Sequence, residues 1–193
     1  MRTLQQELAH DIGRENFDIT DDGLYFPRQS VLAAGLYFDR VNGGEWEQSQ
    51  NLLPTEGLAH LLSVALGATP KPAGYYIALF SGAAAPAANW TAANFATVAS
   101  EVVSLTEGYT SPTRPVWTPP ASTATNSIDN MAAVASLTIA TAGTLNVTGA
   151  ALLTNSTRGG TTGALVSATK YPTARTFQNG DLYDVGYRIS LTV

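Results

Sequence analysis

Apolar and polar residues alternate most regularly at the C-terminal end of the chain, between residues 182 and 193. Because successive side chains of a β-strand point to opposite faces, this alternation predicts a half-buried strand that anchors a sheet. The predicted buried face carries Tyr183, Val185, Tyr187, Ile189, Leu191 and Val193, and the other face carries Asp184, Gly186, Arg188, Ser190 and Thr192. Further strands are predicted over 136–140, 144–153 and 164–168, with turns at Gly143, 158–161 and 179–181.

The first half of the chain also contains apolar runs of strand length. They cover 24–26, 31–39 and 74–80, and Asn42-Gly43-Gly44 is typical of a hairpin turn. Residues 107–126 contain four prolines, which predicts a long ordered loop or an edge segment, because proline cannot donate to a central ladder. Trp117 lies in this segment and needs a burial site, either in the core or under a neighbouring subunit.

Two segments have a helical period instead. Over 55–66, Thr55 is the expected N-cap and Gly67 the expected stop, and the apolar positions predict a packed amphipathic helix. These positions are Leu58, Leu61, Leu62, Ala65 and Leu66. A second short helix is predicted from a cap at Thr91 to about residue 100.

These patterns predict a mainly β protein: an antiparallel β-sandwich or jelly-roll-like body with one or two short helices and an extended N-terminal arm. A mixed α+β sheet capped by the 55–66 helix is the alternative. We expect an arm over 1–22 and a single β-rich domain over 23–193.

The arm carries a narrow apolar stripe at helical spacing, formed by Leu4, Leu8 and Ile12. Such a stripe does not hold a short helix alone in water, so it needs a partner surface. Together with Trp46 and Trp117, these residues are the candidate interface.

Composition narrows the functional classes. The chain has 193 residues and no cysteine, which excludes disulfides, thiolate metal sites and a cysteine nucleophile. Charged residues make up only 13% of the chain, about half the usual share, which indicates surface that is covered in an assembly. Residues 1–60 hold ten of the fifteen acidic residues and four of the ten basic ones, and the rest of the chain is nearly neutral. With a net charge of −5 and no long apolar run, we expect neither nucleic acid nor a membrane as partner, and no secretory signal peptide.

Catalytic and metal motifs are weak. The segment 18–23 resembles part of a calcium loop, but position twelve is Gln29 and an acidic turn is favoured. A catalytic triad would need His10 or His60 as its base, and no Gly-x-Ser-x-Gly elbow occurs. The glycine-rich 158–163 lacks the lysine of a phosphate loop, so a hairpin turn is predicted. We therefore expect no enzymatic activity, no metal and no cofactor; a carbohydrate-binding module using Trp46, Trp90 or Trp117 is the alternative of another class.

Several stretches within residues 50–193 look like small virion structural proteins of tailed bacteriophages. They are 51–58 (NLLPTEGL), 74–82 (GYYIALFSG), 113–117 (TRPVW) and 149–163 (GAALLTNSTRGGTTG). The resemblance implies a non-enzymatic protein that binds the head shell, the neck or the tail as repeated copies.

Within that class the sequence favours a head decoration or cement protein. Its expected partners are the major capsid protein or neck and tail proteins, and it is expected to form a symmetric homo-oligomer in the particle. A collar, neck or tail-fibre attachment protein at the portal vertex is the alternative. The expected location is the virion, assembled in the cytoplasm of the host bacterium.

Overall fold

The computed structural model describes residues 17–19, 25–27 and 32–192. The chain divides into two compact units, one of residues 1–32 with 192–193 and one of residues 33–191. In the first unit, β1 (Phe17–Ile19) pairs with β2 (Tyr25–Pro27) in an antiparallel hairpin. The second unit, here called the body, contains helices α2 and α3 and strands β3 to β12.

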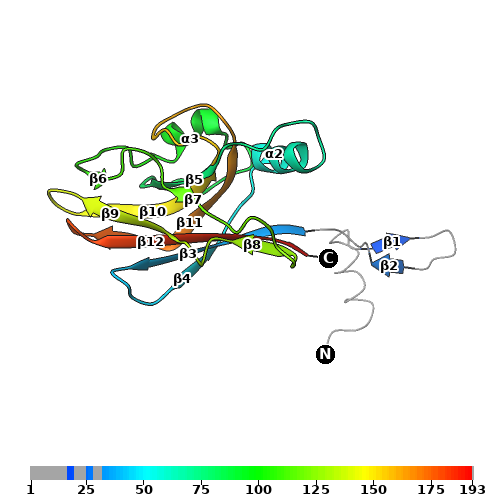
Figure 1. Ribbon diagram of the computed structural model, residues 1–193, viewed down its shortest axis with the longest axis horizontal. Helices are drawn as coiled ribbons and strands as arrows, with labels where there is room; N and C mark the ends of the chain where they lie inside the picture. Colours follow the sequence, from blue (N-terminus) through cyan, green and yellow to red (C-terminus); the bar gives the residue numbers. More distant parts are fainter. Residues whose placement is uncertain (1–16, 20–24, 28–31, 193) are drawn as a thin grey trace. The chain divides into compact units, whose positions relative to one another are not determined.

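Two sheets form the layers of the body (Figure 1). The first has the order β11-β10-β5-β7. Its strands are β5 (Tyr75–Phe80), β7 (Val116–Trp117), β10 (Leu145–Leu153) and β11 (Leu165–Phe177). The second has the order β4-β3-β12-β9-β6, with β8 also paired to β12. Its strands are β3 (Leu32–Val41), β4 (Glu47–Gln50), β6 (Gly108–Tyr109), β8 (Ser127–Asp129), β9 (Ala135–Ala140) and β12 (Leu182–Thr192).

The core lies between these sheets. One continuous cluster joins Ile77 and Val147 of the first sheet to Tyr37, Leu137 and Tyr183 of the second. The registered pairs of both sheets, from β10 with β11 to β12 with β9, are antiparallel. The prediction of a mainly β, antiparallel sandwich-like body with two short helices is therefore confirmed.

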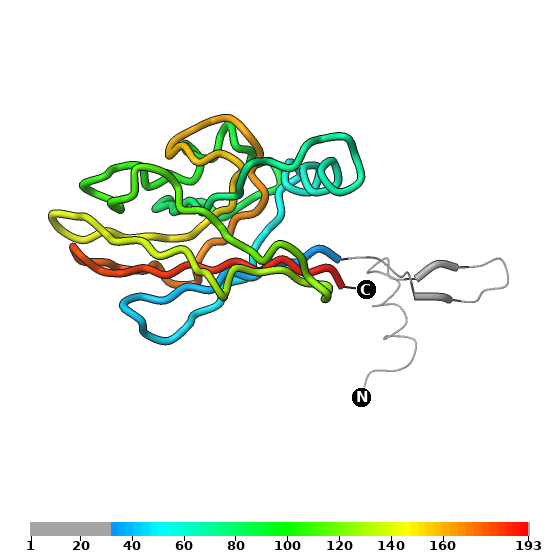
Figure 2. The backbone as a smooth tube through the Cα atoms, in the orientation of Figure 1, coloured from blue at the N-terminus to red at the C-terminus, as the bar shows by residue number. Residues whose placement is uncertain are grey.

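The C-terminal strand occupies the centre of its sheet, between β3 and β9, where the tube of Figure 2 runs red beside blue and yellow-green. Tyr183, Val185 and Tyr187 are buried, as the alternation predicts. The prediction fails further along the strand, because Ile189 is half-buried and Leu191 is exposed. Gly186, expected on the open face, is buried against Met131.

Turn chemistry is placed as expected. Asn42 and Gly43 both have positive φ (52° and 69°) in the β3–β4 hairpin, which requires residues that tolerate this conformation. The proline-rich segment contributes only β6 and β7, each two residues long and each at the edge of a sheet. Proline has no N–H group to donate, and at the edge of a sheet no central ladder needs that donor.

Strand β11 is longer than predicted, since it continues past 168 to Phe177. Pro172 would interrupt a regular strand. Here the register shifts between Val147 and Gly149 of β10, and the residues around Pro172 form a bulge. After it, Arg175 and Phe177 return to the buried side. Strands β4 and β8 were also missed, because 47–50 and 127–129 are too polar and short to stand out.

The helices are α2 (Thr55–Ala65) and α3 (Ala92–Val98). Thr91 caps α3 as predicted: its hydroxyl accepts from the N–H of Asn94, whose side chain accepts from the N–H of Thr91. The predicted cap of α2 is wrong, because Pro54 is the N-cap and Thr55 is the first helical residue. A rigid proline just before the first turn leaves no side-chain oxygen to accept the free N–H groups.

Candidate functional site

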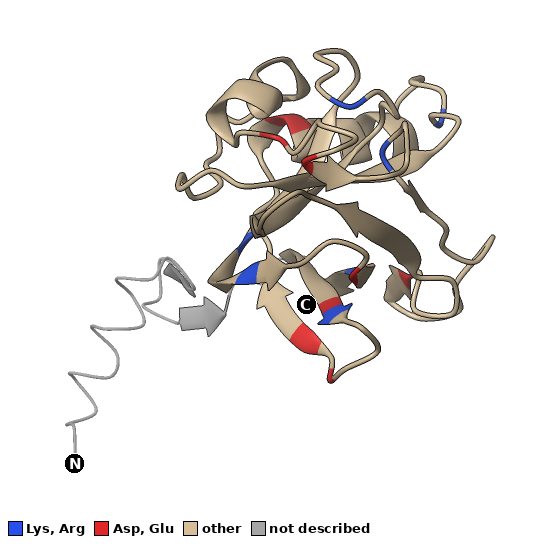
Figure 3. Ribbon diagram, turned by 90° about the vertical axis from the view of Figure 1, so that its left-hand side faces the viewer, with Lys and Arg blue, Asp and Glu red and all other residues tan. Residues whose placement is uncertain are grey.

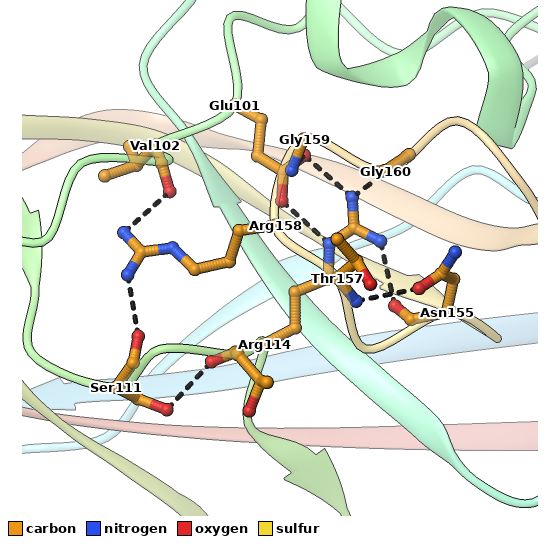
Figure 4. Close-up of polar contacts among 10 residues, drawn as sticks. Glu101, Val102, Ser111, Arg114, Asn155, Thr157, Arg158, Gly159 and Gly160 are labelled. Atoms are coloured by element: carbon orange, nitrogen blue, oxygen red, sulfur yellow. Dashed lines mark hydrogen bonds and ion pairs between the residues drawn. The ribbon is translucent and has the colours of Figure 1, made fainter.

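The most elaborate polar arrangement of the body is a buried cluster around Glu101 and Arg114 (Figure 4). The guanidinium of Arg114 donates from Nε and Nη2 to the two carboxylate oxygens of Glu101, each at 2.7 Å. Both side chains are 0% exposed. This is the two-pronged geometry in which arginine binds a carboxylate most strongly.

The rest of this cluster satisfies the remaining polar groups. Arg114 also donates to the backbone carbonyls of Asn155 (2.8 Å) and Gly160 (3.4 Å). The N–H of Gly159 donates to the Glu101 carboxylate at 3.0 Å. The cluster therefore ties the β10–β11 connection to the segments that follow α3 and precede β7.

Arg158 provides a second anchor from the same connection. Its guanidinium lies 3.6 Å from the ring centre of Tyr109 and donates to four backbone carbonyls. These carbonyls belong to Val102, Ser104, Tyr109 and Ser111. Burial raises the pKa of Tyr109 to about 12, so its hydroxyl stays neutral. Residues 158–163, predicted to be a hairpin turn, thus form the β10–β11 turn and also hold neighbouring loops in place.

A second buried ion pair joins β3 to β11. Arg175 donates to Asp39 from Nε (2.6 Å) and Nη2 (3.2 Å), and Glu47 lies 2.9 Å from Nη2. Burial alone would lower the pKa of Arg175, but the hydrogen bonds and charge of Asp39 raise it above its ordinary value. Its guanidinium lies over the ring of Tyr171, whose pKa is raised well above the ordinary value by burial. The pair is therefore a structural link between β3 and β11.

His60, one of the two candidate bases, is a half-buried residue of α2. Its Nε2 lies 3.2 Å from the hydroxyl of Tyr75, with the rings edge to face. Burial lowers the pKa of His60. Its contacts are those of a packed histidine beside a tyrosine whose own pKa is raised by burial. His10 lies outside the described residues.

One hollow of the body has a volume of about 570 Å³ and is lined by residues of β3, β4, α2 and β12. Its most polar side chains already have partners: Asn51 bonds the N–H of Gly35 and the hydroxyl of Tyr187, and Arg188 bonds Asp129. In the part of the chain that the structure describes, no three acidic or histidine side chains are grouped as a metal site would require. The partial calcium loop over 18–23 lies mostly outside the described residues.

The candidate interface residues have different positions. Leu4, Leu8 and Ile12 lie outside the described residues, so their role stays a prediction. Trp46 is half-buried, with the Arg40 guanidinium 4.4 Å from its ring centre.

Trp117 is in the core, one of the two burial sites that the sequence left open. Its indole N–H donates to the carbonyl of Tyr187 at 2.9 Å, and its ring packs edge to face on Tyr75 and Tyr187. Trp90 is also buried, against Phe80 and Phe95. Of the three tryptophans proposed for sugar binding, Trp90 and Trp117 are thus only 5% and 7% exposed.

The sequence missed one feature of the surface. The apolar residues of α2 were expected to pack, but Leu58, Leu62 and Leu66 are 44%, 62% and 85% exposed. The packing side of α2 centres on Gly57, where a Cβ atom would lie 2.1 Å from the carbonyl oxygen of Val166. Gly57 lets the backbone of α2 lie close to β11. Leu61 packs against the core cluster as expected, whereas Leu58, Leu62 and Leu66 face solvent.

The sequence was compared with protein-family models and with curated proteins, and none of them matches it. Among the described residues, no helix has the length and apolar character needed to span a membrane. We therefore infer function from the residues and their geometry.

Proposed function

We propose that this chain is a non-enzymatic structural component of a tailed bacteriophage particle, with head decoration or cement protein as the favoured role. The proposal rests on the surface of the body, which has few unpaired charges and several exposed large aliphatic side chains. Figure 3 shows how few charged residues interrupt its ribbon. A surface of this kind suits a protein that is covered by neighbours in an assembly.

The arginines of the body show why its surface carries little free charge. All five arginines of residues 33–191 have internal partners: Arg40, Arg114, Arg175 and Arg188 form ion pairs, and Arg158 bonds backbone carbonyls. Meanwhile Leu62, Leu66, Val103, Leu105 and Val116 are all about half exposed or more. The arginines thus hold the fold together, and the exposed aliphatic groups are left for contacts with other chains.

The proposed mechanism is mechanical. A decoration protein that spans the junctions between shell subunits buries apolar surface on both, and each square ångström contributes roughly 25 cal/mol. Repeated over a symmetric shell, this binding free energy opposes the pressure of packaged DNA. The anchored β10–β11 connection and the paired sheets give such a clamp a rigid body.

The test is the copy number of this chain per purified particle, measured by quantitative mass spectrometry against the major shell protein. Hundreds of copies would support the shell role, because only the icosahedral lattice offers so many equivalent sites. A number on the order of six or twelve would place the protein at the collar, neck or tail, where cyclic symmetry sets the count. Absence from particles would refute the proposal.

The arm is tested separately by deleting residues 1–22. We expect the truncated protein to bind shells more weakly while its thermal unfolding transition is retained, because the core cluster is formed by residues of the body. Equal binding by the truncated and full-length chains would show that the arm has no role in attachment.

The carbohydrate-binding alternative now depends on Trp46. Its test is a glycan array with the intact protein and a Trp46→Ala variant. Binding that the variant loses would favour the sugar-binding function, and an array without binding would remove it.

A further inference from the structure

A second hollow of the body lies between its two sheets and has a volume of about 390 Å³. Its floor is formed by Trp117 of β7, Leu152 of β10, Val166 of β11 and Tyr187 of β12, none of which is more than 7% exposed. Strands of both sheets therefore contribute to one cavity that reaches the core. Its volume is within the range of about 300–1,000 Å³ that is typical of small-molecule sites.

The polar side chains in the wall of this hollow already have partners. The indole N–H of Trp117 donates to the carbonyl of Tyr187, and the hydroxyl of Tyr187 accepts from the side chain of Asn51 at 2.9 Å. The hydroxyl of Tyr75 lies 3.2 Å from Nε2 of His60. A water molecule held in a cavity needs several polar partners, so the deep part of the hollow favours an apolar guest over water.

The apolar lining continues beyond this hollow. A neighbouring hollow of about 310 Å³ shares the side chains of Leu61, Ile128 and Ile189 with it. Ala65 and Leu191 extend the apolar lining of this second space. An unbranched hydrocarbon chain suits a lining that extends from one hollow to the next better than a compact ring does.

The rim of the hollow, formed by residues 71–74 and 118–121, carries a single charge. Lys71 is exposed, and it is the one charged residue among those that line the hollow. In the described part of the chain, the ion pairs of the body are all made by arginines, so Lys71 has no carboxylate partner there. The long stem of a lysine covers apolar surface while its ammonium group stays in water. An anionic group at the rim would therefore meet an unpaired positive charge.

We propose that this hollow binds the hydrocarbon chain of a small single-chain carboxylic acid, with Lys71 beside the carboxylate at the rim. The occupant is a free acid and not a lipid held in a bilayer, because the floor of the hollow lies in the core between the sheets. The inference goes beyond the proposed structural role and rests on residues of the body alone.

The first test is isothermal titration calorimetry of the intact protein with hexanoate, octanoate and decanoate. We expect saturable binding with a negative change in heat capacity, because apolar surface is buried. Each added methylene group should tighten binding by about fourfold as long as it enters the hollow. The absence of saturable binding, or an affinity that does not depend on chain length, would overturn the proposal.

The location is tested by Ala73→Trp, which places a large side chain at the rim, where Ala73 lines the hollow and is exposed. The matched control is Ala84→Trp, since Ala84 is exposed and does not line the hollow. We expect Ala73→Trp to lose octanoate binding and Ala84→Trp to keep it, with both variants retaining the thermal unfolding transition. Equal octanoate binding by the two variants would place the acid elsewhere and overturn the assignment.

The role of Lys71 is tested with Lys71→Ala and with the matched control Lys170→Ala, which removes the other lysine of the body. Lys71→Ala should weaken octanoate binding by about fivefold, the upper range for an exposed ion pair, and leave the binding of octanol unchanged. Lys170→Ala should change neither. Octanoate binding that is the same in Lys71→Ala and the intact chain would overturn the assignment of the acid group. These measurements use the isolated protein, so their failure and failure of the particle role can be told apart.

Discussion

The buried pair of Glu101 and Arg114 allows the most demanding test of the structure. In an Arg114→Met variant the side chain keeps much of its length but loses its charge and its four donated hydrogen bonds. Glu101 would then remain in an environment where its side chain is 0% exposed, with the N–H of Gly159 as its remaining donor in the cluster. Removing one partner of a buried ion pair costs about 3–5 kcal/mol, because the other charge is left uncompensated.

Urea denaturation followed by tryptophan fluorescence measures this cost as a change in the free energy of unfolding. For a domain of this size, each kcal/mol lowers the melting temperature by roughly 2–4 °C, so we expect a decrease of about 6–20 °C. The matched control is Arg188→Met. Arg188 and Asp129 form an ion pair at 2.8 Å, close to the 2.7 Å of the buried pair, but their side chains are 41% and 26% exposed. Such exposed pairs contribute about 0–1 kcal/mol.

A double variant, Glu101→Leu with Arg114→Met, separates the interaction energy between the two side chains from the cost of burying each charge. Because no uncompensated charge is left, we expect it to be more stable than the sum of the two single effects predicts. The reasoning would be refuted if Arg114→Met cost less than about 1 kcal/mol, or if the two single effects simply added.

Three further predictions concern other parts of the body. The carboxylate of Glu107 accepts a hydrogen bond from the hydroxyl of Thr141, and this lowers the pKa of Glu107 below the ordinary 4.5. The contribution of Glu107 to stability is therefore present above pH 4.5 and is lost as the pH falls through the folded-state pKa. A Glu107→Gln variant should show a flatter fall of melting temperature below pH 4.5, and an unchanged acid profile would contradict this. Thr91→Ala removes the cap of α3 and should cost about 1 kcal/mol in urea denaturation, whereas Thr91→Ser should cost much less. Gly57→Ala should destabilise the protein, because the added Cβ would meet the carbonyl of Val166, and a neutral effect would show that α2 can move away from β11.

The sequence determined the elements whose signal is local. The alternation over residues 182–187 predicted a strand, and this strand lies at the centre of a sheet. Asn42-Gly43 predicted a hairpin turn, and both residues have positive φ. The prolines of 107–126 correctly restricted that segment to sheet edges. Each of these signals depends on the conformation of a few neighbouring residues, so it can be recognised before the fold is known.

The tertiary structure alone decided which groups meet. Glu101, Arg114 and the 158–160 turn are far apart in the chain, and nothing local marks them as partners. The orientation of α2 was decided in the same way. Its apolar period predicted a helix but not its buried face, because Gly57 allows the backbone itself to pack on β11. Burial depends on the surface that the rest of the chain provides, and for this helix that surface covers Leu61 but leaves Leu58, Leu62 and Leu66 exposed to solvent.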